Sequence, residues 1–353
     1  MESHYSVHQG LRRVCGISLV AISILLNATV SRGASACSYE IYVASLGMTA
    51  IGGTLTVVIQ TGSDCAWSIT GLPAWLTVSG NSQGIGSAEV KVVASENPGG
   101  TRIGVFKVAG VSVPVRQFDL EACKAGTGCL IRPVPHVAFG GAWATDIFAL
   151  STATHAGDLS ISFYDDNGLP VAPPFTGGLG KLSTLTDSVP ALGRKDYQAN
   201  DPSASTQWGW ALVTADSSIE TQAIFRQATP NGTYYEAAVQ TGEAYSHFLI
   251  PFDTTTFAPT GRPLDTAFAI VNLNPLGAAN VVCSVRDASG ALIPDTLTIP
   301  ALKPLGHYAG FLLAPFTGKR GTLTCNSDTM VSAIALRFIG DAFSTLPVIL
   351  PDP

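Results

Sequence analysis

The feature that most constrains the fold of this chain is an internal duplication in its C-terminal part. Three pairs of segments correspond in order and in residue type, and most of their residues fall in short β-prone runs bounded by turn residues. The pairs are residues 158–168 with 280–290, 189–192 with 299–302, and 209–226 with 321–338. The duplication predicts two homologous β-sandwich domains, at residues 133–243 and 244–349.

Residues 37–118 have the pattern of a further β-domain. Seven short β-prone runs lie between turn residues, and in the last run Val111, Val113 and Val115 share one face of the strand. Seven strands in about eighty residues suit an immunoglobulin-like sandwich. With few charged residues, 12% of the total, and 36 glycines, the whole chain is predicted to be all-β, with three tandem immunoglobulin-like sandwiches.

Several motifs in this first segment occur together at characteristic spacings. They are Cys-Ser-Tyr at 37–39, Gly-Gly at 52–53, Cys-Ala-Trp at 65–67, Trp-Leu-Thr-Val at 75–78, Asn-Pro-Gly at 97–99, Arg-Ile-Gly at 102–104, Val-Ala-Gly at 108–110 and Val-Arg-Gln at 115–117. In this order, residues 37–117 resemble the BACON-type immunoglobulin-like domain of exported bacterial proteins. The resemblance implies an immunoglobulin-like fold, export and an association with carbohydrate-active or surface proteins. It carries over no binding residues.

The N-terminus has the three parts of an export signal. Arg12 and Arg13 supply positive charge, residues 14–26 are an apolar run too short for a membrane span, and residues 34–36 are small. We therefore expect residues 1–36 to be cleaved as a signal peptide, leaving a mature chain without a transmembrane segment. Lipid attachment at Cys37 is the alternative interpretation. The expected location is secreted, extracellular or at the cell surface, with the periplasm as a further option.

Six cysteines remain after cleavage, and an even number in an exported chain favours disulfides. They are Cys37, Cys65, Cys123, Cys129, Cys283 and Cys325. Sequence alone permits many connectivities. The connectivity that respects domain order joins Cys37 to Cys65, Cys123 to Cys129 and Cys283 to Cys325, with the middle pair closing a short loop in a linker at residues 119–132.

The sequence offers little for catalysis, and we expect no enzymatic activity, no metal and no cofactor. No Gly-x-Ser-x-Gly motif occurs, and His136, His155, His247 and His307 are far apart with no metal-ligand spacing. Their expected positions are loops and strand ends. Residues 165–168, Asp-Asp-Asn-Gly, are read as a hairpin turn in preference to a calcium loop, because Asn-Gly is the preferred turn dipeptide.

A glycosidase would need two carboxylates that face each other across a cleft. The candidates Glu220, Glu236, Glu243 and Asp253 belong to no motif that marks a pair. Nucleic acid is excluded as a partner because the net charge is −6 and no basic stripe exists.

Aromatic residues are the best candidates for a binding site, because sugar rings pack their C–H faces on flat aromatic side chains. Trp208 and Trp210 are two apart and are expected on one face of a strand; Tyr234 and Tyr235 follow a turn, and Trp143 follows Phe-Gly-Gly-Ala. The sequence favours a non-catalytic, secreted or surface binding or adhesion protein with a carbohydrate, such as a polysaccharide or surface glycan, as ligand. The alternatives are a structural spacer or a module that binds other surface proteins, and, third, a hydrolase.

Overall fold

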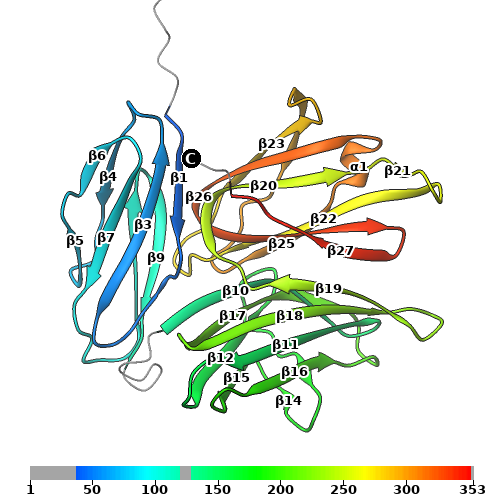
Figure 1. Ribbon diagram of the computed structural model, residues 1–353, viewed down its shortest axis with the longest axis horizontal. Helices are drawn as coiled ribbons and strands as arrows, with labels where there is room; N and C mark the ends of the chain where they lie inside the picture. Colours follow the sequence, from blue (N-terminus) through cyan, green and yellow to red (C-terminus); the bar gives the residue numbers. More distant parts are fainter. Residues whose placement is uncertain (1–36, 120–128, 351–353) are drawn as a thin grey trace, which may run out of the picture. The chain divides into compact units, whose positions relative to one another are not determined.

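The computed structural model describes residues 37–119 and 129–350, and these residues are almost entirely β-structure (Figure 1). They form 27 strands and one four-residue helix, α1 (Leu313–Phe316). The prediction of an all-β fold is confirmed. The expected signal peptide, residues 1–36, lies outside the described residues.

Residues 37–118, here called the N-terminal module, contain nine strands. They are β1 (Tyr39–Val43), β2 (Gly47–Met48), β3 (Gly53–Thr61), β4 (Ala66–Thr70), β5 (Leu76–Ser79), β6 (Gln83–Ile85), β7 (Ala88–Ala94), β8 (Arg102–Val108) and β9 (Val111–Gln117). The seven expected runs are present as strands, and β2 and β6 are two additional, very short strands. Strands pair in the orders β1-β3-β7-β5 and β6-β4-β8-β9-β2, and alternate residues of both layers, such as Val57 and Phe106, enclose one core.

The next ten strands, here called the first repeat, form two sheets. They are β10 (Cys129–Phe139), β11 (Trp143–Ser151), β12 (Gly157–Tyr164), β13 (Pro174–Phe175), β14 (Gly180–Lys181), β15 (Thr184–Val189), β16 (Arg194–Asn200), β17 (Gln207–Asp216), β18 (Ile219–Ala228) and β19 (Tyr234–Gln240). The sheet orders are β10-β17-β12-β15 and β14-β13-β16-β11-β18-β19. Buried residues from both sheets, such as Ile161 and Phe225, share one core. β10 begins at Cys129, inside the segment expected to be a linker.

The last eight strands are here called the second repeat, and seven of them pair in the same order as their counterparts in the first. They are β20 (Ala244–Asp253), β21 (Thr256–Phe257), β22 (Arg262–Asn272), β23 (Val281–Asp287), β24 (Leu292–Thr298), β25 (His307–Phe311), β26 (Arg320–Ile339) and β27 (Ala342–Leu346). The first half of β26 lies between β20 and β23, and its second half lies between β22 and β27. The 20-residue β26 thus takes the places that β17 and β18 share in the first repeat.

Individual hydrogen bonds recur between the two repeats. The Asp158 amide donates to Asp216 Oδ2 over 2.8 Å, and the Asn280 amide donates to Asp328 Oδ1 over 2.9 Å. These residues were aligned from the sequence, and they occupy matching positions in the two strand orders.

The three groups of strands are packed against one another. β1 continues into the second repeat by pairing with β20, where Tyr42 faces Tyr245, and β9 meets β26 where Ser112 faces Thr329. Trp210 of the first repeat is buried in the same core as residues of the N-terminal module. The three groups of strands are therefore joined by strand pairing and by a shared core.

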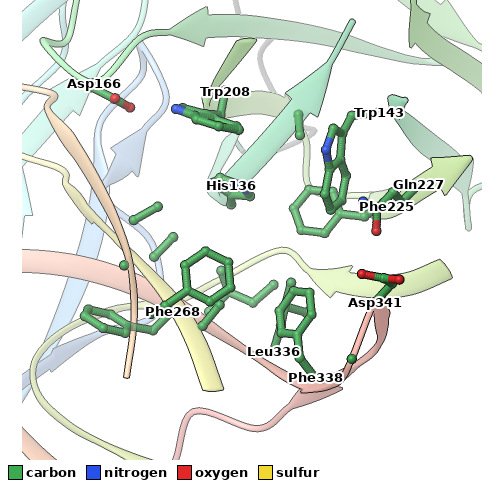
Figure 2. A pocket seen from close by; sticks show the side chains of 18 residues that line it. His136, Trp143, Asp166, Trp208, Phe225, Gln227, Phe268, Leu336, Phe338 and Asp341 are labelled. Carbon is green, nitrogen blue, oxygen red and sulfur yellow. The ribbon is translucent and has the colours of Figure 1, made fainter. Parts of the chain in front are cut away.

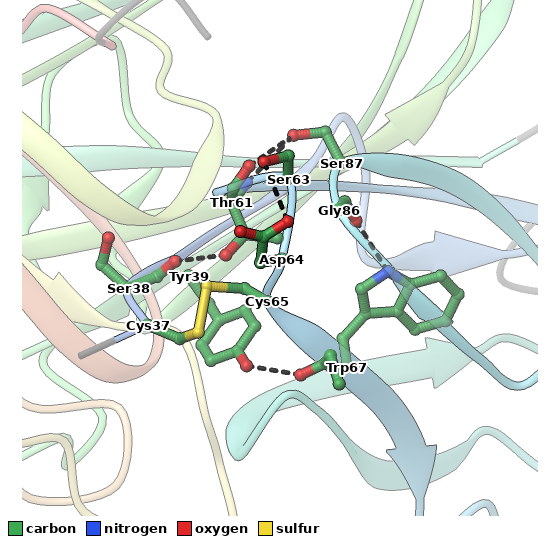
Figure 3. The surroundings of a disulfide bond; sticks show 11 residues. Cys37, Ser38, Tyr39, Thr61, Ser63, Asp64, Cys65, Trp67, Gly86 and Ser87 are labelled. Atoms are coloured by element: carbon green, nitrogen blue, oxygen red, sulfur yellow. Dashed lines mark hydrogen bonds between the residues drawn. A yellow bond between two sulfur atoms is a disulfide. The ribbon is translucent and has the colours of Figure 1, made fainter. Parts of the chain in front are cut away.

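Two of the three expected disulfides are present. Cys37 bonds to Cys65, with the Cα atoms 5.6 Å apart, and Cys283 on β23 bonds to Cys325 on β26, with the Cα atoms 4.1 Å apart. Near the first bridge, Thr61 Oγ1 donates to the Ser38 carbonyl over 2.6 Å (Figure 3). Cys123 and the side chain of Cys129 lie outside the described residues, so the third pairing stays a prediction. Within residues 37–119 and 129–350, no helix is long and apolar enough to cross a membrane.

Candidate functional site

A pocket of about 340 Å³ lies between the first and the second repeat (Figure 2). Its walls are mainly aromatic and aliphatic, and a few polar side chains interrupt them. The aromatic residues are Trp143, Trp208, Phe225, Phe268, Phe311 and Phe338. The polar residues are His136, Asp166, Gln227 and Asp341. This composition, apolar walls with a small number of polar groups, is typical of sites that bind small molecules.

Beside the pocket, a chain of aromatic rings in contact with one another joins the two repeats. Trp143 at the start of β11 stacks on Phe343 of β27, with ring centroids 5.6 Å apart. Phe343 contacts Phe338 at 5.3 Å, and Phe338 contacts Phe311 at 5.5 Å. Aromatic pairs at such distances add to the stability that burial provides, so these contacts stabilise the junction of the two repeats.

Trp208 on β17 provides a second, more open surface of the pocket. Its register partner on the neighbouring strand is the small residue Ala138, and half of Trp208, 50%, is exposed. Figure 2 shows its ring extending over His136. A flat indole face is thus accessible beside polar atoms.

At one end of the pocket, His136, His307 and Asp166 form a hydrogen-bonded chain. His136 Nδ1 lies 2.9 Å from His307 Nε2, and His307 Nδ1 lies 2.7 Å from Asp166 Oδ1. The His307 side chain is completely buried, whereas the Asp166 side chain is 53% exposed. His136 and Asp166 belong to the first repeat and His307 to the second, so the chain also links the repeats.

A β-bulge places His136 in this position. The pairing of β10 with β17 shifts register between Val134 and Val137, and Pro135, which has no amide hydrogen to donate, lies within the irregular segment. The His136 ring then packs edge-on against Phe225, with centroids 5.1 Å apart, and stacks on His307 at 5.0 Å.

Burial lowers the pKa of His136 well below its ordinary value, and the neighbouring His307 lowers it further. Burial penalises the charged imidazolium, and a second positive charge beside it would do the same. His136 is therefore neutral at physiological pH, and it keeps one nitrogen without a proton.

His136 lies inside strand β10 and not in the loop or strand end expected of it, whereas His307 begins β25, as expected. The fold brings these two histidines into contact. His247 lies elsewhere, with Nδ1 2.6 Å from Asn326 Oδ1, and His155 is in the loop after β11. No spacing in the sequence could show the His136–His307 contact, because it depends on how the repeats pack. Pro135 within a β-prone run was the one local sign of an irregular strand. Within the described residues, no group of three or more His, Cys, Asp or Glu could hold a metal.

The predicted aromatic residues lie in three different environments: in the pocket wall, in the core and outside the pocket. Trp143 and Trp208 line the pocket. Trp210 shares a face of β17 with Trp208, as expected, but it is completely buried: it stacks on Tyr164 at 5.0 Å, and its Nε1 donates to the Leu305 carbonyl over 2.7 Å. No ligand can contact Trp210 in this conformation.

The two tyrosines of β19 lie beside the pocket but do not line it. Tyr235 pairs with Gln227, which pairs in turn with Trp143, so these three residues form a row across the sheet. Tyr234 is 61% exposed, and its neighbouring position in the strand places it on the opposite face.

The carboxylates considered for a glycosidase are all engaged elsewhere. Glu220 forms an ion pair with Arg132, Glu236 with Arg226, and Asp253 with Arg320, and Glu243 is hydrogen-bonded to Tyr42. Residues 165–168 form a turn in which Asp165 Oδ1 accepts hydrogen bonds from the amides of Asn167 and Leu169. The hairpin-turn interpretation of this segment is thus in accord with its hydrogen bonds.

No protein-family model matches the chain, and a search of curated proteins finds no match. The likeness of residues 37–117 to BACON-type domains rests on their motifs alone.

Proposed function

We propose that this protein is a non-catalytic carbohydrate-binding protein and that its ligand occupies the pocket between the two repeats. The observation that carries the proposal is the half-exposed Trp208 ring beside the polar groups of His136 and Asp166. A pyranose ring could lay its C–H face on the indole and direct its hydroxyl groups to these acceptors. Trp143 and Gln227, at the other side of the pocket, offer a similar combination.

The pairing of the four candidate carboxylates supports binding without catalysis. A general acid or nucleophile must face the substrate. None of these four groups lines the pocket beside Trp208; three are paired with arginine and one with tyrosine. The pocket carboxylates, Asp166 and Asp341, come from different repeats, and Asp166 is bonded to His307.

The two disulfides indicate a compartment outside the reducing cytoplasm. We infer from the N-terminal sequence that the protein is secreted or held at the cell surface. We also propose that the chain divides into a BACON-like module at residues 37–118 and two duplicated sandwiches at residues 133–243 and 244–349.

A glycan array tests the proposed function. We expect the mature protein to bind one or more glycans and Trp208→Ala to weaken this binding at least tenfold. Tyr234→Ala is the matched control, because it removes an exposed aromatic ring outside the pocket. Absence of binding to every glycan, or equal loss in both variants, would refute the proposal.

A structural spacer is the second candidate function, and the β1–β20 pairing favours it. This pairing continues a sheet from the N-terminal module into the second repeat, which stiffens the described chain. A spacer would retain its activity in Trp208→Ala, so the same variant separates the two functions.

A further inference from the structure

We propose that His136 is the specificity-determining residue of the pocket: its Nε2 atom accepts a hydrogen bond from a hydroxyl group on a neutral, ring-shaped ligand. This inference rests on the proposed function, because it places the ligand in the same pocket. It adds the chemical class of that ligand. His307 and Asp166 fix the positions of the protons on the two imidazole rings.

The proton positions follow from the hydrogen bonds. An ionised carboxylate can only accept, so the Asp166 carboxylate requires the proton of His307 to be on Nδ1. With one proton on each ring, His307 Nε2 has no proton and accepts from His136 Nδ1–H. A neutral His136 with its proton on Nδ1 has a lone pair on Nε2. Asp166 therefore sets the tautomer of His136 through His307.

His136 Nε2 has no hydrogen-bond partner among the described residues, and the ring lies in the wall of the pocket (Figure 2). The carbon atoms of the surrounding side chains, Phe225 and Trp208 among them, donate no hydrogen bond to Nε2. An acceptor in an apolar site selects ligands strongly, because a ligand that lacks the donor leaves the acceptor unsatisfied.

Asp166 and His307 are held in place by the contact between the repeats. The His307 amide donates to the Asp166 carbonyl over 3.2 Å, and Lys303 Nζ donates to Asn167 Oδ1 over 2.8 Å. Gly168 in the same turn approaches the second repeat so closely that an added Cβ would lie 2.0 Å from the Pro304 carbonyl oxygen. The turn at residues 165–168 is thus fixed against the second repeat, and Asp166 acts as a positioning residue for His307.

The charges and walls of the pocket define the class of ligand. Asp166 and Asp341 both line it, so an anionic ligand would meet negative charge at two points. Aromatic walls on both repeats favour a ring with an apolar face. Pyranosides and phenols share this chemistry, because both combine an apolar face with a hydroxyl donor.

The tautomer can be measured without a ligand. In ¹⁵N-labelled mature protein at pH 7, we expect His136 to show a protonated Nδ1 and an unprotonated, pyridine-type Nε2. Asp166→Asn should redistribute the His307 and His136 tautomers, which a purely structural role for Asp166 would not do. A His136 Nε2 that carries a proton in the wild type would overturn the inference.

Three probes then test recognition: p-cresol, toluene and a methyl glucoside. We expect p-cresol to bind roughly tenfold more tightly than toluene and to shift the Nε2 resonance, because only p-cresol donates a hydrogen bond. His136→Phe should abolish this preference while the aromatic walls still bind toluene. Equal affinity for the two probes, or no binding of p-cresol, would overturn the inference.

The glucoside and the glycan array separate the two proposals. If p-cresol binds through Nε2 but no glycan binds, carbohydrate is the wrong ligand class and the role of His136 stands. If glycans bind without any change at Nε2, the carbohydrate function stands and the role of His136 is refuted.

Discussion

The imidazole rings of His136 and His307 are joined by a 2.9 Å contact between Nδ1 and Nε2, although 171 positions separate them in the chain. The first ring belongs to strand β10 and the second begins strand β25, so the contact exists only when the two repeats are packed. It closes one end of the pocket and connects the geometry of the pocket to the stability of the contact between the repeats.

Replacing His307 should therefore destabilise the protein. His307→Leu removes the acceptor for His136 Nδ1–H and leaves a buried donor unsatisfied, which costs about 1–3 kcal/mol. We expect the free energy of unfolding, measured by urea denaturation, to fall by this amount. Asp341→Asn, a change at the other end of the pocket, is the control and should have little effect. Equal stability of His307→Leu and wild type would show that the His136–His307 bond contributes nothing.

The lowered pKa of His136 predicts a dependence of stability on pH. The unfolded chain takes up a proton near the ordinary pKa of about 6.5, whereas the folded chain resists protonation, so the unfolded state binds more protons as the pH falls. The contribution is complete above about pH 6.5 and is lost as the pH is lowered below that value. The titratable group in contact with His136 is His307, and Asp166 and Asp341 line the same pocket.

The measurement is the free energy of unfolding of wild type and His136→Phe between pH 8 and pH 5. Other carboxylates titrate in both proteins, so the difference between the two curves isolates His136. We expect wild type to lose more stability than the variant over this interval. Parallel curves would contradict the assigned pKa shift.

The all-β fold could be predicted because alternation and turn residues are local signals. Val57 and its neighbours in β3 alternate between buried and half-buried, and the paired cysteines of β23 and β26 were placed by domain order. The site could be predicted only in part. Trp143 and Trp208 were identified from their chemistry, but the difference between Trp208 and Trp210, and the approach of His307 to His136, depend on packing between segments distant in sequence.

The disulfide between Cys283 and Cys325 should contribute substantially to stability. Both residues are almost completely buried, at 1% and 0% exposed, and the bridge spans 42 positions. Closing a loop of this size in the unfolded chain corresponds to about 4 kcal/mol. We expect the double variant Cys283→Ala with Cys325→Ala to lose roughly this free energy of unfolding. Counting thiols in the denatured, unreduced protein gives an independent check, since free thiols at these two positions would exclude the bridge.

The two tryptophans of β17 should separate stability from binding. Trp210 is 0% exposed and packs where all three groups of strands meet, so Trp210→Ala creates a cavity and should cost about 3–5 kcal/mol. Trp208 is 50% exposed on the same face, so Trp208→Ala should cost less than about 1 kcal/mol while it removes the aromatic surface of the pocket. Urea denaturation and glycan binding, measured on both variants, test this division. A large loss of stability in Trp208→Ala would mean that its ring is needed for packing and would remove the main reason to regard it as a binding residue.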